Sequence, residues 1–165
     1  MLKLEFENRV KAMSGRGASA IKNVAATSLA RAEKVLASMP KFKSRVHGTV
    51  ILTLTGDTQI RALNREYRGI DKPTDVLSFS YFGGERFPGD DAVDDTVGEI
   101  IISVATAKKQ AREHGKTLNE EMQFLFIHGV LHVFGFDHIK PGERKIMFDL
   151  QEKVLGNTSW RAIYS

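Results

Sequence analysis

The sequence predicts an α+β domain in which about five helices pack on one mixed, four-stranded sheet. Three observations lead to this prediction. Short stretches with the alternation or apolar content of strands are interleaved with longer stretches that have the apolar spacing of helices. The 165 residues contain no internal repeat and no linker long enough to divide them, so we expect a single domain over residues 1–165. The chain has no cysteine, so neither disulfides nor thiolate ligands are expected.

The first third of the chain predicts one strand and one long helix. Residues 2–7 alternate between apolar and charged side chains, which is the period of a half-buried strand. The segment Ser14-Gly15-Arg16-Gly17 is expected to break the chain. An alanine-rich stretch over 18–38 then has the apolar spacing of an amphipathic helix, which ends before Pro40.

The middle of the chain predicts two more strands with a short helix between them. Residues 46–55 place several apolar side chains on one face of a strand. Asp57 or Thr58 can cap a short helix that runs to Tyr67. After a loop that contains glycine and proline, residues 76–81 have the composition of a third strand.

A long acidic loop over 83–96 precedes the fourth strand. Its carboxylates could bind a hard cation, and the alternative is a solvated loop without a ligand. Residues 97–102 are nearly continuous in apolar side chains, which indicates a strand inside the sheet. The aspartates of the loop are Asp90, Asp91, Asp94 and Asp95.

Three further helices are predicted after the fourth strand. Ser103 can cap a helix over 104–114. Thr117 and Glu120 have the capping-box pattern that opens the next helix. A proline and a glycine then start a last helix over 141–155. Its inward side chains are expected to be Ile146, Met147, Leu150 and Val154.

Histidines gather at the end of the fourth predicted helix. His128 and His132 are four residues apart, so both imidazoles lie on one helical face. Gly135 favours a helix end, and His138 follows where the returning chain can bring a third imidazole to the same point. Three of the five histidines therefore fall in the pattern H-x3-H-x5-H. Without a ligand for these rings, the helix that contains the apolar run over 122–127 would have to bury unpaired polar groups.

This pattern predicts a zincin-like helix that holds one zinc ion per chain. Three nitrogens leave one coordination position open, which is typical of a catalytic zinc, whereas a structural zinc is closed by four ligands. The alternatives are a hydrogen-bonded histidine cluster and a different metal that imidazole binds, such as nickel. The zinc-peptidase motif H-E-x-x-H carries its general base directly after the first histidine, but Gly129 stands there in this sequence. A base must come from elsewhere, or the reaction proceeds without one.

Charge is distributed unevenly along the chain. Residues 1–45 hold ten Lys or Arg and three Glu, whereas the remainder holds 14 basic and 17 acidic residues. The basic first third suits an anion such as nucleic acid, and the alternative is a solvated helix with unbalanced charge. No run has the length and apolar character of a membrane span or an export signal, so we expect a soluble protein with no membrane contact.

Two stretches resemble the YbeY family of bacterial endoribonucleases, also called rRNA maturation factors. They read YRGIDKPTDVLSF over 67–79 and HGVLHVFGFDH over 128–138, and their order and separation match that family as well. The resemblance extends from about residue 46 to 155. It implies a single-domain, metal-dependent endoribonuclease with one zinc ion. The zinc ligands that it implies are His128, His132 and His138.

The resemblance also implies a role for Arg68 and a set of partners. Arg68 stands at the position of the family's important arginine, and a guanidinium can hold a phosphate through two parallel hydrogen bonds. The alternative is a surface or carboxylate-paired arginine. The family acts in the cytoplasm on single-stranded RNA, matures the 3′ end of 16S rRNA and takes part in ribosome quality control. The implied partners are therefore rRNA and the small ribosomal subunit with its associated factors, and not DNA.

Other residues near these motifs have weaker implications. Thr74 and Asp75 precede a buried strand and are expected to fix the loop, not to react. Asp137 either orients a metal-bound imidazole or caps the segment that follows it. Departures from the family pattern are Ser80 in place of a frequent proline, Phe136 in place of tyrosine and Glu99 in place of aspartate.

The predicted chemistry is metal-assisted cleavage of a phosphodiester. Zinc would lower the pKa of its water to about 7 and polarise a phosphate oxygen, while Arg68 holds the phosphate. The nucleophile is either that water or the 2′-hydroxyl of the RNA. Attack by the 2′-hydroxyl would leave a cyclic phosphate. A zinc peptidase and a non-enzymatic, ribosome-binding module with a structural zinc are the competing classes.

Overall fold

The computed structural model of the chain describes residues 1–82, 95–157 and 159–164. Within these residues the architecture is α+β, which confirms the predicted fold class. Most of the predicted acidic loop, including Asp90, Asp91 and Asp94, lies outside the described residues. Across the described ranges, no helix combines the length and the apolar character needed to span a membrane.

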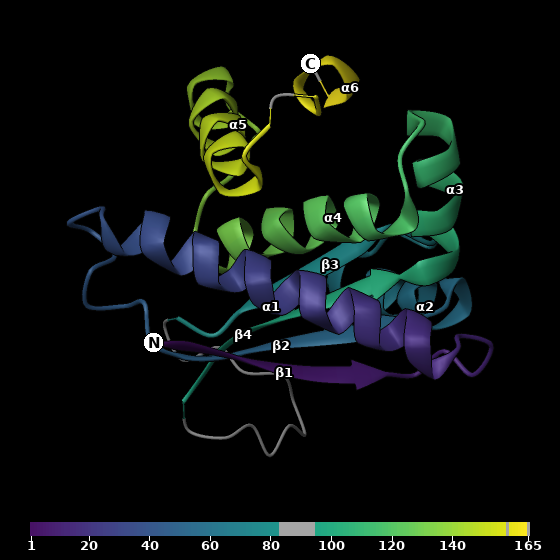
Figure 1. Ribbon diagram of the computed structural model, residues 1–165. Helices are drawn as coiled ribbons and strands as arrows, with labels where there is room; N and C mark the ends of the chain where they lie inside the picture. The colour runs from purple at the N-terminus through teal and green to yellow at the C-terminus, as the bar shows by residue number, and fades with distance from the viewer. Residues whose placement is uncertain (83–94, 158, 165) are drawn as a thin grey trace.

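Four strands form one mixed sheet in the order β1-β2-β4-β3 (Figure 1). β1 (Leu2–Asn8) pairs parallel with β2 (Gly48–Thr55), and β2 pairs parallel with β4 (Thr96–Ser103). β3 (Val76–Ser80) pairs antiparallel with β4 at the edge. β4 therefore lies inside the sheet, as its apolar run predicted.

Six helices occur in the described part of the chain, one more than predicted. The additional helix, α6, has four residues and is too short to give a periodic sequence pattern. The helices are α1 (Gly15–Ala37), α2 (Asp57–Arg68), α3 (Val104–His114), α4 (Leu118–Val133), α5 (Pro141–Leu155) and α6 (Arg161–Tyr164).

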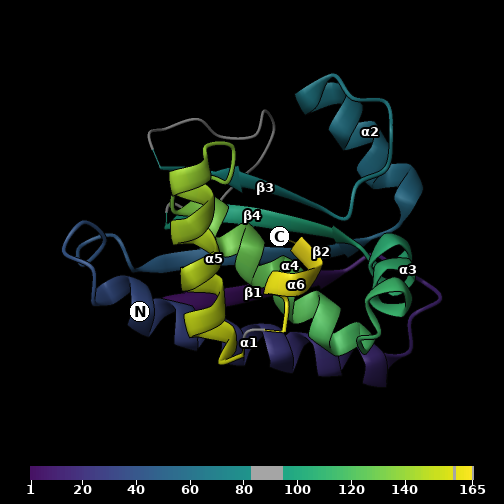
Figure 2. The same cartoon turned by 90° about the horizontal axis from the view of Figure 1, so that it is seen from above.

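The helices are arranged in layers around the sheet (Figures 1 and 2). α1 and α4 lie against one face, and α5 and α6 lie on the outer side of α4. Seen from above, α5 runs across α4 (Figure 2). α2 packs on the opposite face, where Ile60 joins Leu77 and Ile101 in a second, small apolar cluster. α4 is thus enclosed between the sheet and the outer helices.

Two glycines allow α4 to lie close to the sheet. A Cβ atom at Gly129 would come within 2.8 Å of Ile100 Cγ2, and one at Gly98 would come within 2.5 Å of Val133 Cγ1. Gly129 therefore faces β4, about 100° around α4 from His128. A glutamate at that position would project into the packed core, which gives a physical reason why the H-E-x-x-H pattern is absent.

Three details of the sequence prediction were wrong. Neither Asp57 nor Thr58 is the N-cap of α2, because Gly56 holds that position and no side chain caps the helix. The glycines of 14–17 do not break the chain, because the Ser14 side chain accepts a hydrogen bond from Gly17 N and caps the first turn of α1. Ile146 does not point inward and is 52% exposed. It lies about 100° around α5 from Met147, which is buried together with Val154.

Candidate metal centre

Three imidazoles converge at the C-terminal end of α4. His128 and His132 project from the helix, and His138 returns to them from the following loop. The ring centroids of His128 and His132 lie 4.6 Å apart, and each lies 5.3 Å from the centroid of His138. One nitrogen from each ring lies within 4.8 Å of the other two. The structure therefore brings together the three histidines that the sequence selected.

The end of α4 directs the chain back toward its own histidines. The Phe136 amide donates to the Leu131 carbonyl at 3.0 Å, and the Gly135 amide donates to the His132 carbonyl at 2.9 Å. This is a Schellman motif, and it requires the positive φ of +92° at Gly135. The centroid of the Phe136 ring then lies 5.2 Å from that of Phe42, which ties the returning loop to the turns that follow α1.

The carboxylate of Asp137 completes this turn. Its Oδ1 accepts a hydrogen bond from the His138 amide at 2.7 Å. Asp137 is not the helix cap that we considered, because the residue before α5 is Lys140. Its negative charge acts to raise the pKa of His132. Asp137 therefore positions the third histidine through its backbone.

Gln151 of α5 fixes the orientation of His128. Its side chain is 2% exposed, and its Oε1 lies 3.0 Å from His128 Nδ1. When Nδ1 carries the proton and donates it to this oxygen, the lone pair of Nε2 points toward the cluster. Sequence reasoning missed Gln151. The available signal was a polar residue on the apolar face of α5, between Met147 and Val154.

The two histidines of α4 are held in the form that binds a cation. Burial, followed by the neighbouring charge of His132, lowers the pKa of His128 from 6.5 to about 4. Burial and the charge of His138 also lower the pKa of His132. Both rings are therefore neutral at pH 7, and their nitrogen lone pairs are available.

The distances suit a single metal ion. The Nε2 atoms of His128 and His132 are 3.0 Å apart. Two nitrogens bound to tetrahedral zinc at ordinary bond lengths lie roughly 3.3 Å apart. Because the donors are three imidazoles with no thiolate and no fourth side chain in the described cluster, the set fits an open, catalytic type of site.

Arg68 lies on α2, a second helix besides α4 whose charge reaches the histidine cluster. It is the last residue of α2 and is exposed, and Gly69 ends the helix with a φ of +69°. Its positive charge contributes to lowering the pKa of His132, which places the guanidinium within electrostatic reach of the cluster. Among the described residues no carboxylate forms an ion pair with Arg68. Asp71 pairs instead with Arg61, at 2.9 and 3.1 Å.

The loop before β3 is fixed as predicted. Asp75 Oδ1 accepts from the Val76 amide at 2.8 Å and from Thr74 Oγ1 at 3.3 Å. The Asp75 carbonyl accepts from the Ser103 amide at 2.9 Å, which joins the loop to the end of β4. The Asp75 carboxylate also acts to raise the pKa of His128, so its charge is felt in the cluster.

Glu99 belongs to a different face of the sheet. Its neighbours in β4, Gly98 and Ile100, face α4, so the alternation of a strand directs Glu99 to the other side. There its carboxylate accepts hydrogen bonds from Thr53 Oγ1 and Tyr81 Oη, both at 3.3 Å. Glu99 is therefore separated from the histidines by the sheet.

Fold and site together define a class: an α+β domain whose central helix presents a three-histidine cluster able to hold a metal ion. Comparison with known proteins identifies the family within that class. The family model described as "Endoribonuclease YbeY" matches residues 16–159. The chain belongs to this family, and the match includes α1, which the motif-based resemblance did not cover.

Individual relatives agree with the family match. An Endoribonuclease YbeY of Heliobacterium modesticaldum is 50% identical over 113 residues, which cover 66% of this chain and 68% of the relative. One of Listeria monocytogenes is 40% identical over 133 residues, or 74% of this chain and 81% of the relative. A solution structure of a Thermotoga maritima protein aligns with a TM-score of 0.54 and 25% identity, over 97% of this chain and 93% of that one.

Proposed function

We propose that this protein is a metal-dependent endoribonuclease that cleaves single-stranded RNA, with one zinc ion held by His128, His132 and His138. The convergence of these three imidazoles in a member of the Endoribonuclease YbeY family carries the proposal. The relatives are named as endoribonucleases, which supports RNA as the substrate. Residues 1–165 would form a single catalytic domain.

The residues of this chain would divide the work as follows. A bound zinc ion would act as a Lewis acid on a phosphate oxygen and on a water molecule. His128 would be oriented by Gln151, and His138 by the turn that Asp137 holds. Arg68, with no carboxylate partner among the described residues, would hold the phosphate and offset the charge that develops on it.

We further propose rRNA as the natural substrate, with the 3′ end of 16S rRNA as the cleavage region and a role in ribosome quality control. The small ribosomal subunit and its associated factors would be the partners, and the cytoplasm would be the location. The family membership supports these proposals. They go beyond the names of the relatives, which specify endoribonuclease activity alone.

A peptidase mechanism lacks its usual base in this structure. Gly129 takes the position of the peptidase glutamate, and a side chain there would run into Ile100. RNA carries its own nucleophile, because its 2′-hydroxyl could attack the neighbouring phosphorus as the 5′-oxygen leaves, with the hydroxyl proton passing to a water molecule. The packing of α4 on β4 therefore favours RNA over peptide as the substrate.

The direct test compares two substrates under identical conditions. Purified protein is incubated with single-stranded RNA and with an unfolded protein, each before and after chelation and readdition of zinc. We expect RNA cleavage that is lost on chelation, restored by zinc and absent in His138→Ala. Peptide cleavage without RNA cleavage would overturn the proposal. Mass spectrometry of the RNA ends then identifies the nucleophile, since a cyclic phosphate requires attack by the 2′-hydroxyl.

A further inference from the structure

A hollow of about 300 Å³ lies along the N-terminal half of α5. The Nε atom of Arg144 donates a long hydrogen bond of 3.4 Å to the carbonyl oxygen of His138. The hollow therefore begins beside the backbone of a candidate metal ligand. Phe148, one turn further along α5, contributes a partly buried aromatic ring. The lining residues are Pro141, Arg144, Lys145, Phe148 and Arg161.

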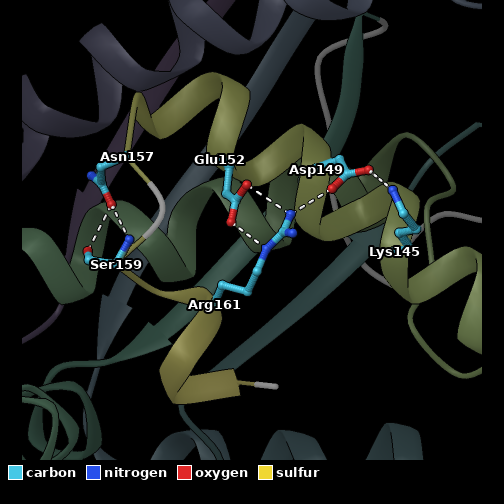
Figure 3. Close-up of polar contacts among 6 residues, drawn as sticks. All are labelled: Lys145, Asp149, Glu152, Asn157, Ser159 and Arg161. Atoms are coloured by element: carbon cyan, nitrogen blue, oxygen red, sulfur yellow. Dashed lines mark hydrogen bonds and ion pairs between the residues drawn. The ribbon is translucent and has the colours of Figure 1, made fainter.

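Arg161 of α6 forms one wall of the hollow and is held in place by carboxylates of α5 (Figure 3). Its Nε and Nη2 donate to the two oxygens of Glu152 at 2.7 and 2.9 Å. Nη2 also donates to Asp149 at 2.7 Å, and Lys145 binds the other oxygen of Asp149 at 2.7 Å. These bonds fix the guanidinium plane, and they offset the charge of both carboxylates.

The chemistry of this lining suits a nucleotide. Unpaired bases stack on aromatic rings and on guanidinium planes, and arginine side chains bind phosphate. Phe148 supplies a ring, and Arg161 supplies a guanidinium whose orientation is already fixed. In the described parts of the chain no carboxylate pairs with Arg144, so its charge is available to a phosphate. The three cations of the lining exceed the two carboxylates beside them, which leaves a positive rim.

We propose that this hollow, the α5 subsite, binds one nucleotide of single-stranded RNA next to the phosphate that is cleaved. The base would lie against Phe148 and Arg161, and its phosphate would bind Arg144. The inference rests on the proposed endoribonuclease activity and specifies how that site holds its substrate. Arg68 would contact the RNA from the α2 side of the histidine cluster, and Arg144 would contact it from the α5 side.

The test couples the ring of Phe148 to one base of the substrate. A set of short RNAs, each with one abasic position, is cleaved by the zinc-loaded wild-type protein and by Phe148→Leu, which removes the ring and keeps an apolar side chain. In the wild type, one abasic position near the cleaved bond should lower kcat/KM about tenfold. In Phe148→Leu, an abasic nucleotide at that position should not lower kcat/KM further. Phe148→Tyr should restore the wild-type pattern.

Arg144→Gln tests the phosphate contact. It should lower kcat/KM for all of the RNAs alike and reduce the salt dependence of binding, because one phosphate contact is lost. Lys109→Gln, the same change of charge on the exposed face of α3, should alter neither quantity. If Phe148→Leu unfolds, Arg144→Gln decides alone, since Arg144 is exposed.

The two proposals fail in different ways. If the wild type cleaves RNA, two results would overturn the α5 subsite and leave the endoribonuclease proposal standing. Either Phe148→Leu shows the same abasic pattern as the wild type, or Arg144→Gln shows an unchanged salt dependence of binding. A wild type that holds zinc and cleaves no RNA would overturn the endoribonuclease proposal and the subsite with it.

Discussion

The histidines and the arginines around them are positioned by opposite kinds of structure. From Glu121 to Val133 every residue of α4 is buried except Gln123, His128 and His132. Arg68 and Arg144 are exposed, on α2 and α5. The proposed metal ligands of α4 are therefore fixed by the packing of the core, whereas the arginines proposed to bind phosphate lie on its surface.

This difference implies that the two groups can be separated by mutation. A change beneath α4 should disturb folding and metal binding together, because both depend on the same packed surface. A change at an exposed arginine should reduce activity and leave folding intact. The predictions below test that separation, from the largest expected effect to the smallest.

Arg68→Ala should give the largest effect, a loss of about 100-fold or more in kcat/KM for RNA, because the donor that stabilises the phosphate is removed. Its urea-unfolding midpoint and its zinc content should stay at wild-type values, since Arg68 is exposed. Arg65→Ala, an exposed arginine on the same helix, serves as the matched control and should lose little activity. A destabilised Arg68→Ala protein would mean that this arginine belongs to the structural core of the site.

Gly98→Ala should destabilise the protein by about 3 kcal/mol, since its Cβ atom would have to displace Val133 and α4 from the sheet. Urea unfolding measures the change. Gly142→Ala provides the control, because a Cβ atom there meets nothing within 4 Å. Equal stability of the two variants would show that α4 is less tightly packed on β4 than the distances indicate.

Gln151→Leu should weaken zinc binding by about 10- to 100-fold, because His128 Nδ1 loses the acceptor that fixes the ring. Competition with a zinc-binding dye measures the affinity. The control is Gln123→Leu, which removes a hydrogen bond of similar kind, from Gln123 Nε2 to Ser28 Oγ, away from the cluster. Unchanged affinity in Gln151→Leu would remove Gln151 from the site.

Acid should destabilise the metal-free protein through His128. The unfolded chain takes up a proton on this residue near pH 6.5, whereas burial and His132 lower the pKa of the folded state to about 4. Between these values the unfolded state binds more protons than the folded state. The contribution of His128 to stability is therefore fully present above pH 6.5 and is lost as the pH drops toward 4. The expected loss between pH 7 and pH 4 is about 3 kcal/mol.

Urea unfolding of the metal-free protein between pH 4 and pH 7 measures this loss. His128→Gln should flatten the dependence, and His47→Gln, at an exposed position, should leave it unchanged. Parallel pH profiles for the wild type and His128→Gln would show that His128 is not held neutral by its surroundings.

The sequence predicted the parts of the fold that repeat a simple pattern. The apolar run of β4 placed it inside the sheet, and the four-residue spacing of His128 and His132 placed both rings on one face of α4. Both predictions depend only on local geometry. α6 escaped prediction because four residues carry no period, and Ser14 was taken for a chain break because a cap and a turn use the same residue types.

The surroundings of the histidines depended on contacts between distant parts of the chain. Gln151 lies 23 residues after His128, and only the packing of α5 on α4 brings the two together. Glycine stands at position 129 because Ile100 of β4 packs against it, and this contact joins residues that are distant in the sequence. One chain can indicate which residues bind a metal, but the residues that orient them are selected by the tertiary structure.

The most direct test of the central claim is the metal content and coordination of the freshly purified protein, measured beside His138→Ala. Elemental analysis should give one zinc ion per chain in the wild type, and X-ray absorption should show three imidazole ligands and a fourth ligand, an oxygen atom from solvent. His138→Ala should fold and lose most of its zinc. A wild type that holds no more metal than His138→Ala, or a metal closed by four protein ligands, would contradict a catalytic three-histidine site.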